Sequence, residues 1–457
     1  MLFSSIPFLY YFLPCVLLFY FAVPAKIKNL MLLLFSLVFY AWGEPRLVLL
    51  MVITIGIGYL LGVLTEEYPK LKKLFLILAL VLSLGTLGYF KYANFFVENF
   101  SAVTGLSVPL LKIALPIGIS FYTFQILSYN IDVYRGEVPA QRDPLKLATY
   151  ITMFPQLIAG PIVRYKDIAL QLETRSHSFD KAALGIRRFI FGLSKKVLIA
   201  NVMGELCEIF RQSNEKSVLF YWMYAIAFSL QIYFDFSGYS DMAIGLGKVF
   251  GFDFMENFNY PYISKSITEF WRRWHISLGT WFRDYVYIPL GGSRVKAWRW
   301  FLNILVVWML TGFWHGAAWN FILWGLFFAL FLMVEKLFLL KYLEKGRVLN
   351  HLYVLCAVII SFVIFNGNSM AEIVGDVGGM LGFGGVSFIT AETLYYLKSY
   401  ALVFVLAILG ATPLPKMIVS KLKIAQYVEP LILFVLLVMV TAYLVDGSFN
   451  PFLYFRF

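Results

Sequence analysis

Two of the four histidines in this 457-residue chain stand in surroundings that suit proton transfer. His315 lies between two uncharged apolar runs, residues 300–310 and 321–334, and is flanked by Gly312 and Gly316. An ionisable side chain at membrane depth costs roughly 2.5 kcal/mol or more, so it usually lines a cavity and has a task. Since free imidazole has a pKa of about 6.5, it gives and takes protons near neutral pH. These observations make His315 a candidate general base.

His275 lies in residues 268–289, a segment rich in aromatic and basic side chains. Wound as a helix at about 100° per residue, the segment gathers its aromatic side chains in one arc and most of its charges opposite. This pattern predicts an amphipathic helix at the membrane interface. The arc holds Trp271, Trp274, His275, Leu278, Trp281, Phe282 and Tyr285, while Arg272, Arg273, Thr280, Arg283 and Asp284 face the other way and Ile276 is a misfit.

Two interpretations of His275 stay open. It is either a packed, hydrogen-bonded structural residue or a member of a reaction chamber shared with His315. A zinc site is disfavoured, because the chain has no HExxH motif and no thiolate near these histidines. Arg272 and Arg273 suit phosphate or carboxylate groups and are candidate substrate-binding residues.

A polar stretch at residues 233–245 interrupts the apolar runs in the middle of the chain. It carries Asp235, Asp241 and several hydroxyls, and carboxylates at membrane depth need partners such as an arginine or a helix N-terminus. Ser240 or Asp241 is placed to cap a helix over residues 242–250. Asp241 is therefore either a helix cap engaged in an ion pair or a residue in direct contact with substrate.

Upstream, prolines on both sides of Gly160 predict that residues 153–164 do not form a straight helix. Broken backbone is tolerated at membrane depth where it lines a cavity or is buried in protein. The following residues, 164–196, hold eight basic against three acidic side chains. This run is either a cytoplasmic collar facing lipid or the landing site of an anionic donor such as a nucleotide thioester.

The composition indicates a membrane protein built of helices. Hydrophobic residues make up 61% of the chain and charged residues 14%, whereas soluble domains are about 25% charged. We expect an all-α polytopic protein, one integral-membrane domain over residues 1–457, with roughly eleven transmembrane helices plus re-entrant and interfacial helices. The expected apolar segments are 6–23, 29–42, 47–64, 74–90, 113–131, 147–162, 186–202, 218–234, 241–250, 300–313, 319–340, 352–365, 400–409 and 430–445.

The net charge of +12 is typical, in a chain this apolar, of basic cytoplasmic loops and contact with anionic lipid, and not of nucleic-acid binding. Basic residues follow the first, third and fifth expected spans, at 26–28, 70–73 and 135–146. The positive-inside rule makes these loops cytoplasmic and puts the N-terminus outside. The three scattered cysteines are expected to be small buried hydrophobes: Cys15, Cys207 and Cys356.

These segments together resemble the membrane-bound O-acyltransferase family, in particular the branch of the bacterial alginate O-acetylation membrane proteins. The resemblance covers most of the chain, and several long motifs occur in the same order. Its most specific motifs lie at residues 233–241, 269–278, 283–285, 288–292 and 312–316, with further matches at 128–136, 155–162 and 450–457.

The resemblance implies a funnel-shaped helical core in which His315 is the family's near-universal histidine and His275 its second histidine. The implied activity, in the bacterial cell membrane, is transfer of an acyl group, usually acetyl, from a thioester such as acetyl-CoA to a hydroxyl. In this branch the acyl group crosses the membrane to an extracytoplasmic polysaccharide, and a separate extracytoplasmic acetyltransferase often completes the transfer. The branch that transfers D-alanine from a carrier protein to teichoic acid is similar in fold and ranks second, because its motif usually lacks the Trp-Arg-Arg-Trp-His form.

On this reading His315 is the base, while His275 orients the reactants, polarises the thioester carbonyl or relays the proton. Trp274, Trp314 and Trp319 are expected to wall the chamber, Asp241 is a further substrate-binding candidate, and no metal is required. No serine or cysteine adjoins a histidine in a nucleophile motif, which favours direct transfer. Non-enzyme alternatives are a transporter or a passive scaffold of a polysaccharide export complex, although no inverted repeat is visible.

Overall fold

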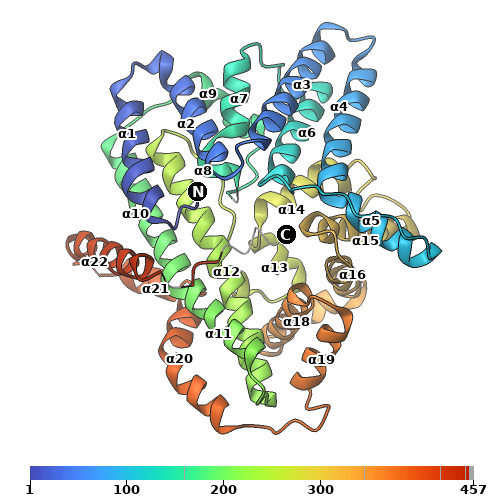
Figure 1. Ribbon diagram of the computed structural model, residues 1–457, viewed down its shortest axis with the longest axis vertical. Helices are drawn as coiled ribbons and strands as arrows, with labels where there is room; N and C mark the ends of the chain where they lie inside the picture. The colour runs from blue at the N-terminus through green and yellow to red at the C-terminus, as the bar shows by residue number, and fades with distance from the viewer. Residues whose placement is uncertain (159, 344, 423, 448, 452–457) are drawn as a thin grey trace. The chain divides into compact units, whose positions relative to one another are not determined.

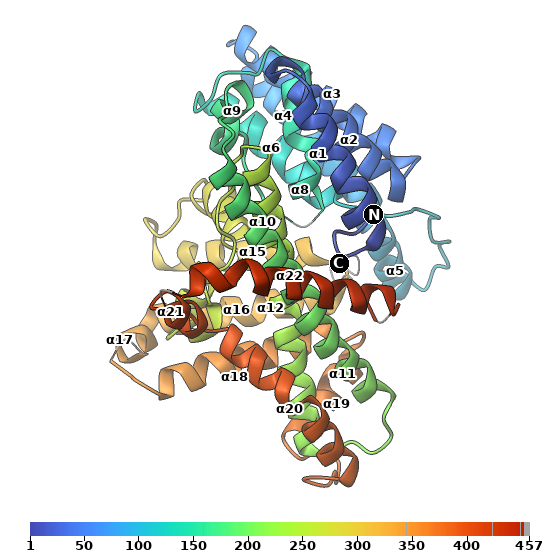
Figure 2. The ribbon, with the colours of Figure 1, turned by 90° about the vertical axis from the view of Figure 1, so that its left-hand side faces the viewer.

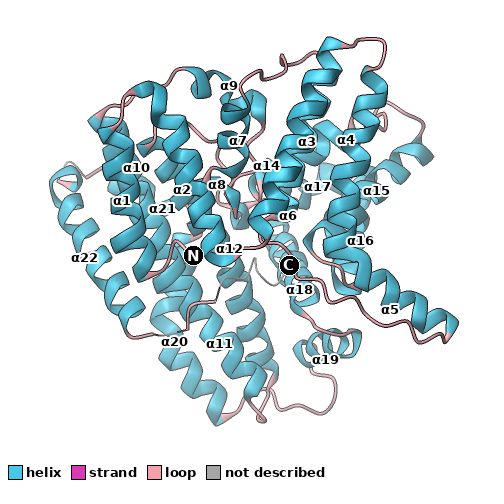
Figure 3. Cartoon of the chain, turned by 45° about the horizontal axis from the view of Figure 1, so that its top comes forward, coloured by secondary structure: helices cyan, strands magenta, loops and turns pink. Residues whose placement is uncertain are grey.

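The computed structural model describes residues 1–158, 160–343, 345–422, 424–447 and 449–451. Within these ranges every regular element is a helix and no strand occurs (Figure 3), so the predicted all-α class is confirmed. The chain forms two compact units, one of Met1–Phe189 with Ser240–Met255 and the other of Ile190–Tyr239 with Glu256–Phe457. The expectation of a single domain over the whole chain stays a prediction.

Eight helices in the described part of the chain are long and apolar enough to cross a membrane. Each reaches the roughly 20 apolar residues that a hydrocarbon core requires. The chain is therefore a multi-span membrane protein. These helices are Ala25–Gly43, Leu47–Glu67, Lys72–Thr104, Val218–Val249, Trp319–Leu343, Leu349–Asn366, Ala391–Gly410 and Tyr427–Val445.

The first unit is a set of packed helices in which α3 and α6 approach closely (Figure 1). A Cβ added at Gly58 of α3 would stand 2.7 Å from Ile126 Cγ2, and one at Gly62 would stand 2.7 Å from Tyr129 Cε1. Glycine at these two positions lets the helix backbones pack together. The helices are α1 (Leu13–Ala22), α2 (Lys28–Gly43), α3 (Leu47–Glu67), α4 (Lys72–Leu87), α5 (Ala93–Thr104), α6 (Ile119–Arg135), α7 (Pro144–Thr152), α8 (Phe154–Leu157), α9 (Tyr165–Glu173) and most of α10 (Phe179–Ser194).

The basic connections of this unit meet at one end. Arg142, before α7, pairs with Glu66 and Glu67 at the end of α3, at 2.5 Å each. Lys166 of α9 lies 2.6 Å from Glu137, which follows α6. These contacts agree with the expectation that the loops after the third and fifth spans face the same side of the membrane. The side itself stays a prediction.

The broken backbone expected at residues 153–164 is confirmed. Helix α7 ends at Thr152, Met153 turns away with φ −48° and ψ 109°, and α8 lasts only from Phe154 to Leu157. The expected apolar span over 147–162 is therefore wrong as a straight helix. Proline lacks an amide hydrogen and clashes with the preceding turn, which stops helical propagation here.

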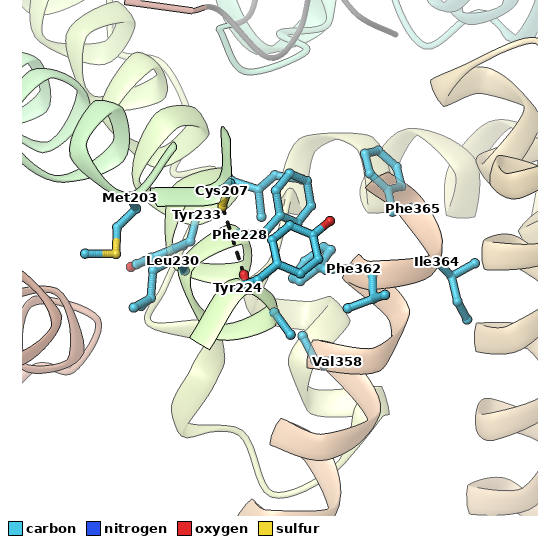
Figure 4. Packing of buried hydrophobic residues seen from close by; sticks show 14 of the residues in the cluster. Met203, Cys207, Tyr224, Phe228, Leu230, Tyr233, Val358, Phe362, Ile364 and Phe365 are labelled. Carbon is cyan, nitrogen blue, oxygen red and sulfur yellow. Dashed lines mark hydrogen bonds between the residues drawn. The ribbon is translucent and has the colours of Figure 1, made fainter. Parts of the chain in front are cut away.

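The second unit contains both candidate histidines and a large aromatic core. In Figure 4, Cys207 and Tyr224 lie together with Phe228 and Phe362, and the Cys207 thiol faces the Tyr224 carbonyl at 4.0 Å. Burial of Cys207 is confirmed, whereas the same expectation is wrong for the exposed Cys15, and Cys356 is half-buried. The helices are α11 (Asn201–Gln212), α12 (Val218–Val249) up to Tyr239, α13 (Ile267–Arg273), α14 (Ile276–Phe282), α15 (Ala297–His315), α16 (Trp319–Val334), α17 (Leu340–Leu343), α18 (Leu349–Asn366), α19 (Met370–Met380), α20 (Ala391–Gly410), α21 (Leu414–Val419) and α22 (Ala425–Val445).

Helix α12 runs without interruption through the polar stretch at 233–245. The expected helix start at residue 242 is therefore wrong, and neither Ser240 nor Asp241 is a cap. Side-chain partners explain the continuity, because Asp241 lies 2.8 Å from Arg188 and Asp235 lies 2.6 Å from Lys196. Because Arg188 and Lys196 pair with the two carboxylates, these side chains do not compete for the backbone hydrogen bonds of α12.

Candidate active site

The aromatic–basic segment at 268–289 is broken at His275, so the single amphipathic helix expected there is wrong. Helix α13 ends at Arg273, Trp274 is extended, and His275 has φ 44° and ψ 53°, in the left-handed region. That conformation is uncommon for any residue except glycine, although histidine is among the side chains enriched there. Hydrogen bonds to Asn257, which accepts through its backbone and side-chain oxygens, hold His275 in this conformation.

Asn257 caps the second half of the break. Its backbone carbonyl accepts from the Ile276 amide at 3.0 Å, and its side-chain Oδ1 accepts from the Ser277 amide at 3.2 Å. These are the first amides of α14, which no residue within that helix can satisfy. Asn257 therefore replaces the hydrogen bonds that a continuous helix would have made, and the chain can turn at His275.

The His275 ring is buried and held at one nitrogen. The side chain is 1% exposed, and the Phe236 ring of α12 meets it edge-on with 4.6 Å between centroids. Nδ1 lies 3.1 Å from Asn257 Oδ1, whereas the buried Nε2 has no hydrogen-bond partner among the described residues. A buried polar atom without a partner is costly in a folded protein and commonly marks a functional position.

Glu335 anchors the other side of the break. It lies in the π-helical segment Glu335–Leu339 that follows α16, and its side chain is fully buried. The carboxylate accepts from the Ile267 amide at 2.6 Å, from the Thr268 amide at 2.8 Å and from the Thr268 hydroxyl at 2.6 Å. Negative charge at a helix N-terminus satisfies the free amides and opposes the helix dipole. The position of α13 is thereby tied to α16.

His315 is the last residue of α15, where the chain turns sharply into α16. Close packing forces the turn: a Cβ at Gly312 would stand 2.2 Å from the Phe321 carbonyl oxygen, and one at Gly316 would stand 2.1 Å from Phe321 Cε2. The His315 side chain is 8% exposed. Its ring lies 5.2 Å from that of Trp324 and 5.3 Å from that of Phe365.

Trp314 brings the two histidines into one site. Its ring lies 5.0 Å from the His315 ring and 6.1 Å from the His275 ring, centroid to centroid. Burial, and after it the nearby charge of His315, holds the pKa of His275 well below its usual range. Both histidine rings therefore lie beside Trp314, and the reaction chamber expected to hold them stays a prediction. Their catalytic roles stay predictions.

The other predicted site residues differ in their surroundings. Trp274 is buried and lies 5.2 Å from Phe362, centroid to centroid, whereas Trp319 is 57% exposed at the start of α16. Arg272 is exposed, and Arg273 pairs with Glu269 at 2.8 Å. For Asp241 the ion-pair reading is confirmed, with Arg188 as its partner, and contact with substrate stays a prediction. Among the described residues no group of three His, Cys, Asp or Glu side chains gathers as a metal site would require.

Sequence reasoning missed Asn257 and Glu335, which position His275 from elements distant in the chain. It also missed Lys196, which is 2% exposed and pairs with Asp235. The Lys196 ammonium also donates to Asn201 Oδ1 at 2.8 Å and to the Pro451 carbonyl. A lysine inside an apolar run was the available signal, because such a charge must find partners. The rest of the closing motif, residues 452–457, lies outside the described residues.

Comparison with known proteins identifies a family whose members are similar to this chain. The model of the MBOAT, membrane-bound O-acyltransferase family matches residues 137–371. The chain is similar to the probable alginate O-acetylase AlgI of Azotobacter vinelandii, with 44% identity over 84% of this chain and 79% of that protein. It is 34% identical to the peptidoglycan O-acetyltransferase of Helicobacter pylori over 85% of this chain and 81% of that one. The teichoic acid D-alanyltransferase of Bacillus subtilis is 31% identical over 54% of this chain and 65% of its own.

Proposed function

This chain belongs to the membrane-bound O-acyltransferase family, and we propose that it transfers acetyl groups from a cytoplasmic thioester, acetyl-CoA above all, for O-acetylation of an extracytoplasmic polysaccharide. Similarity to an alginate and to a peptidoglycan O-acetyltransferase over most of the chain supports this choice of acyl group and acceptor. The observation that carries the proposal is the pairing of two buried histidines, His275 and His315, across Trp314. A water-poor enclosure strengthens electrostatic interactions and limits hydrolysis of a thioester.

In the proposed reaction, His315 takes the proton of the acceptor hydroxyl while the oxygen attacks the thioester carbonyl carbon. A new C–O bond forms, the C–S bond breaks, and the thiolate leaves with the proton returned by the imidazolium. A positioned base contributes about 10²- to 10⁴-fold. Ser277, near His275, donates its hydroxyl hydrogen to Asn257 at 2.9 Å, which supports direct transfer over an acyl-serine intermediate.

The remaining candidates are assigned to substrate contact. Trp274 and Trp314, both buried, are proposed to wall the chamber. The exposed Trp319 and Arg272 are available to an arriving substrate. Arg273 and Asp241 are engaged in ion pairs, so their contact with substrate requires that these pairs open.

The finer membrane arrangement belongs to the same proposal. It consists of roughly eleven spans around a funnel-like core in the bacterial cell membrane, with the N-terminus outside. The basic connections that meet at one end of the first unit support a cytoplasmic face there. The donor enters from that side, and an extracytoplasmic acetyltransferase is the proposed partner that completes the transfer.

Two alternatives make different predictions. D-alanyl transfer requires an acyl carrier protein as donor, and the more limited similarity to a teichoic acid D-alanyltransferase favours it less. A transporter or scaffold would not need His315 at all. Genes for a hydrolase-like acetyltransferase and a polysaccharide synthase beside the gene of this protein would favour acetylation.

Membrane vesicles test the proposal directly. Inverted vesicles, which expose the cytoplasmic face, are expected to incorporate label from [¹⁴C]acetyl-CoA, and right-side-out vesicles are expected to incorporate far less. The His315→Ala protein, matched for expression, serves as the control for enzyme-dependent label. Equal incorporation by both vesicle types would overturn the proposed donor side, and label that is independent of His315 would overturn the proposed chemistry.

A further inference from the structure

The orientation of the Asn257 side-chain amide is fixed by a backbone donor. The Ser277 amide lies 3.2 Å from the atom placed as Asn257 Oδ1. A backbone amide can only donate, so the atom that it meets must be the carbonyl oxygen and not the NH₂ group. The Ser277 hydroxyl donates to the same oxygen at 2.9 Å.

That oxygen in turn decides where the proton of His275 lies. Asn257 Oδ1 can only accept, and it stands 3.1 Å from His275 Nδ1. A neutral imidazole carries its proton on one nitrogen and a lone pair on the other. Since Nδ1 must be the donor toward Asn257, Nε2 is left with the lone pair.

The bare Nε2 is buried and has no hydrogen-bond partner among the described residues. Its ring is 1% exposed and lies against the site that contains Trp314 and His315. We propose that Asn257 is a positioning residue that holds His275 in the neutral Nδ1–H tautomer, so that Nε2 accepts the hydrogen bond of the substrate hydroxyl. This inference rests on the proposed acyl transfer and names the atom that receives that hydroxyl.

The tautomer determines which of the roles proposed for His275 are chemically possible. With no proton on Nε2, the neutral ring has nothing to donate from that atom to a thioester carbonyl. It can orient the acceptor hydroxyl and relay its proton through Nε2 to His315, which stays the base of the proposed reaction and returns the proton to the leaving thiolate. Burial and the nearby His315 both disfavour protonation of His275 and lower its pKa. The neutral ring, with Nε2 as an acceptor, is therefore the resting state, and the imidazolium is transient.

The tautomer is measurable without any activity assay. The protein has only four histidines, and ¹⁵N spectra of histidine-labelled protein in phosphatidylglycerol bilayers at pH 8 distinguish protonated from bare ring nitrogens. The signals of His275 are identified by their loss in His275→Asn. We expect a proton on Nδ1 and none on Nε2. A proton on Nε2 would overturn the proposal and leave the proposed acyl transfer standing.

Variants of Asn257 give the second test. In Asn257→Ala the acceptor for Nδ1–H is lost and the Ser277 hydroxyl, 3.4 Å from Nδ1, can donate to Nδ1, which moves the proton to Nε2. In Asn257→Asp a carboxylate still accepts from Nδ1–H, so the tautomer is retained. The control is Asn350→Ala, which removes a buried asparagine that caps the Leu343 and Gly346 carbonyls and should leave the His275 spectrum unchanged.

Kinetics complete the test in the labelled vesicles. A wrong histidine tautomer can cost about 10⁴ in kcat in serine proteases, and we expect Asn257→Ala to lose about tenfold or more in kcat with little change in KM. Asn257→Asp is expected to restore most of the loss. Wild-type kcat in an Asn257→Ala protein whose tautomer has changed would overturn the positioning role. No transfer by the wild type, with the expected tautomer present, would instead overturn the proposed function.

Discussion

The two turns that hold the histidines are built by opposite means. The His275 turn, at Trp274–His275, is polar: a left-handed residue is held by hydrogen bonds that Asn257 accepts, and Glu335 caps the adjoining helix. The His315 turn, at residues 315–318, is steric: it exists because Gly312 and Gly316 have no Cβ to meet Phe321. Removing one hydrogen bond lowers stability by a limited amount and leaves the others in place. An added atom that overlaps a backbone carbonyl forces the two helices apart.

Because the two turns differ, the two histidine rings are held in different ways. The backbone of His315 is set by the packing of α15 on α16, and its ring lies against aromatic rings. The ring of His275 has one nitrogen committed to Asn257 and one without a partner in the described structure. Damage to the steric turn should therefore remove function abruptly, and damage to the polar turn should reduce it in steps.

The largest effect is expected from Gly312→Ala. The new methyl would stand 2.2 Å from the Phe321 carbonyl oxygen, and such overpacking commonly costs about 1–3 kcal/mol or more. We expect loss of transfer together with a lower thermal midpoint of the purified protein. Gly375→Ala in α19, where no atom lies within 4 Å of the added Cβ, is the control. An unaltered midpoint in Gly312→Ala would show that the two helices do not pack as described.

An intermediate effect is expected at His275. His275→Ala removes both ring nitrogens and should lower the transfer rate by about 10²-fold or more, in line with loss of an acid–base group. His275→Asn keeps one hydrogen-bonding group of similar reach and should retain part of the activity. Both rates are measured in the labelled vesicles at equal protein level. Full activity in both variants would leave His315 as the only histidine in the chemistry.

The smallest effect is expected at Glu335, which acts on His275 only through α13. The Ile267 and Thr268 amides donate to different oxygens of Glu335, so Glu335→Gln keeps an acceptor for only one of them and loses the charge. Hydrogen bonds to charged groups contribute about 1.5–3 kcal/mol. We expect a rate lowered several-fold and a larger loss in Glu335→Ala. If both variants lost activity as completely as Gly312→Ala, the polar turn would not respond in steps and the contrast between the turns would fail.

Much of the fold followed from the sequence because its signals are local. Hydropathy predicted the helices later found at Leu47–Glu67 and Trp319–Leu343, and proline predicted the break after Thr152. Two of the errors share one cause. A helix start was expected at residue 242 and a continuous helix through His275, and in each place the deciding partner is distant in sequence: Arg188 pairs with Asp241, and Asn257 accepts from the Ser277 amide.

Only part of the candidate site could be predicted from the sequence, because the other part depends on contacts between distant residues. His275 and His315 are conspicuous because ionisable side chains are rare among apolar ones. Asn257 and Glu335 have ordinary surroundings in the sequence, and only the folded chain brings them to α14 and α13. A residue that acts by positioning another carries no local signature of its role.

His315 is proposed as the base of acyl transfer, and the O-acetyl content of the extracytoplasmic polysaccharide is a direct measure of that role. Cells that produce wild-type or His315→Ala protein at equal levels in the membrane are compared after the polymer is purified and its esters are released by mild alkali. We predict that ester content in the variant falls by about 10²-fold or more, to the level of cells without the protein. Wild-type ester content in cells with His315→Ala would contradict the claim.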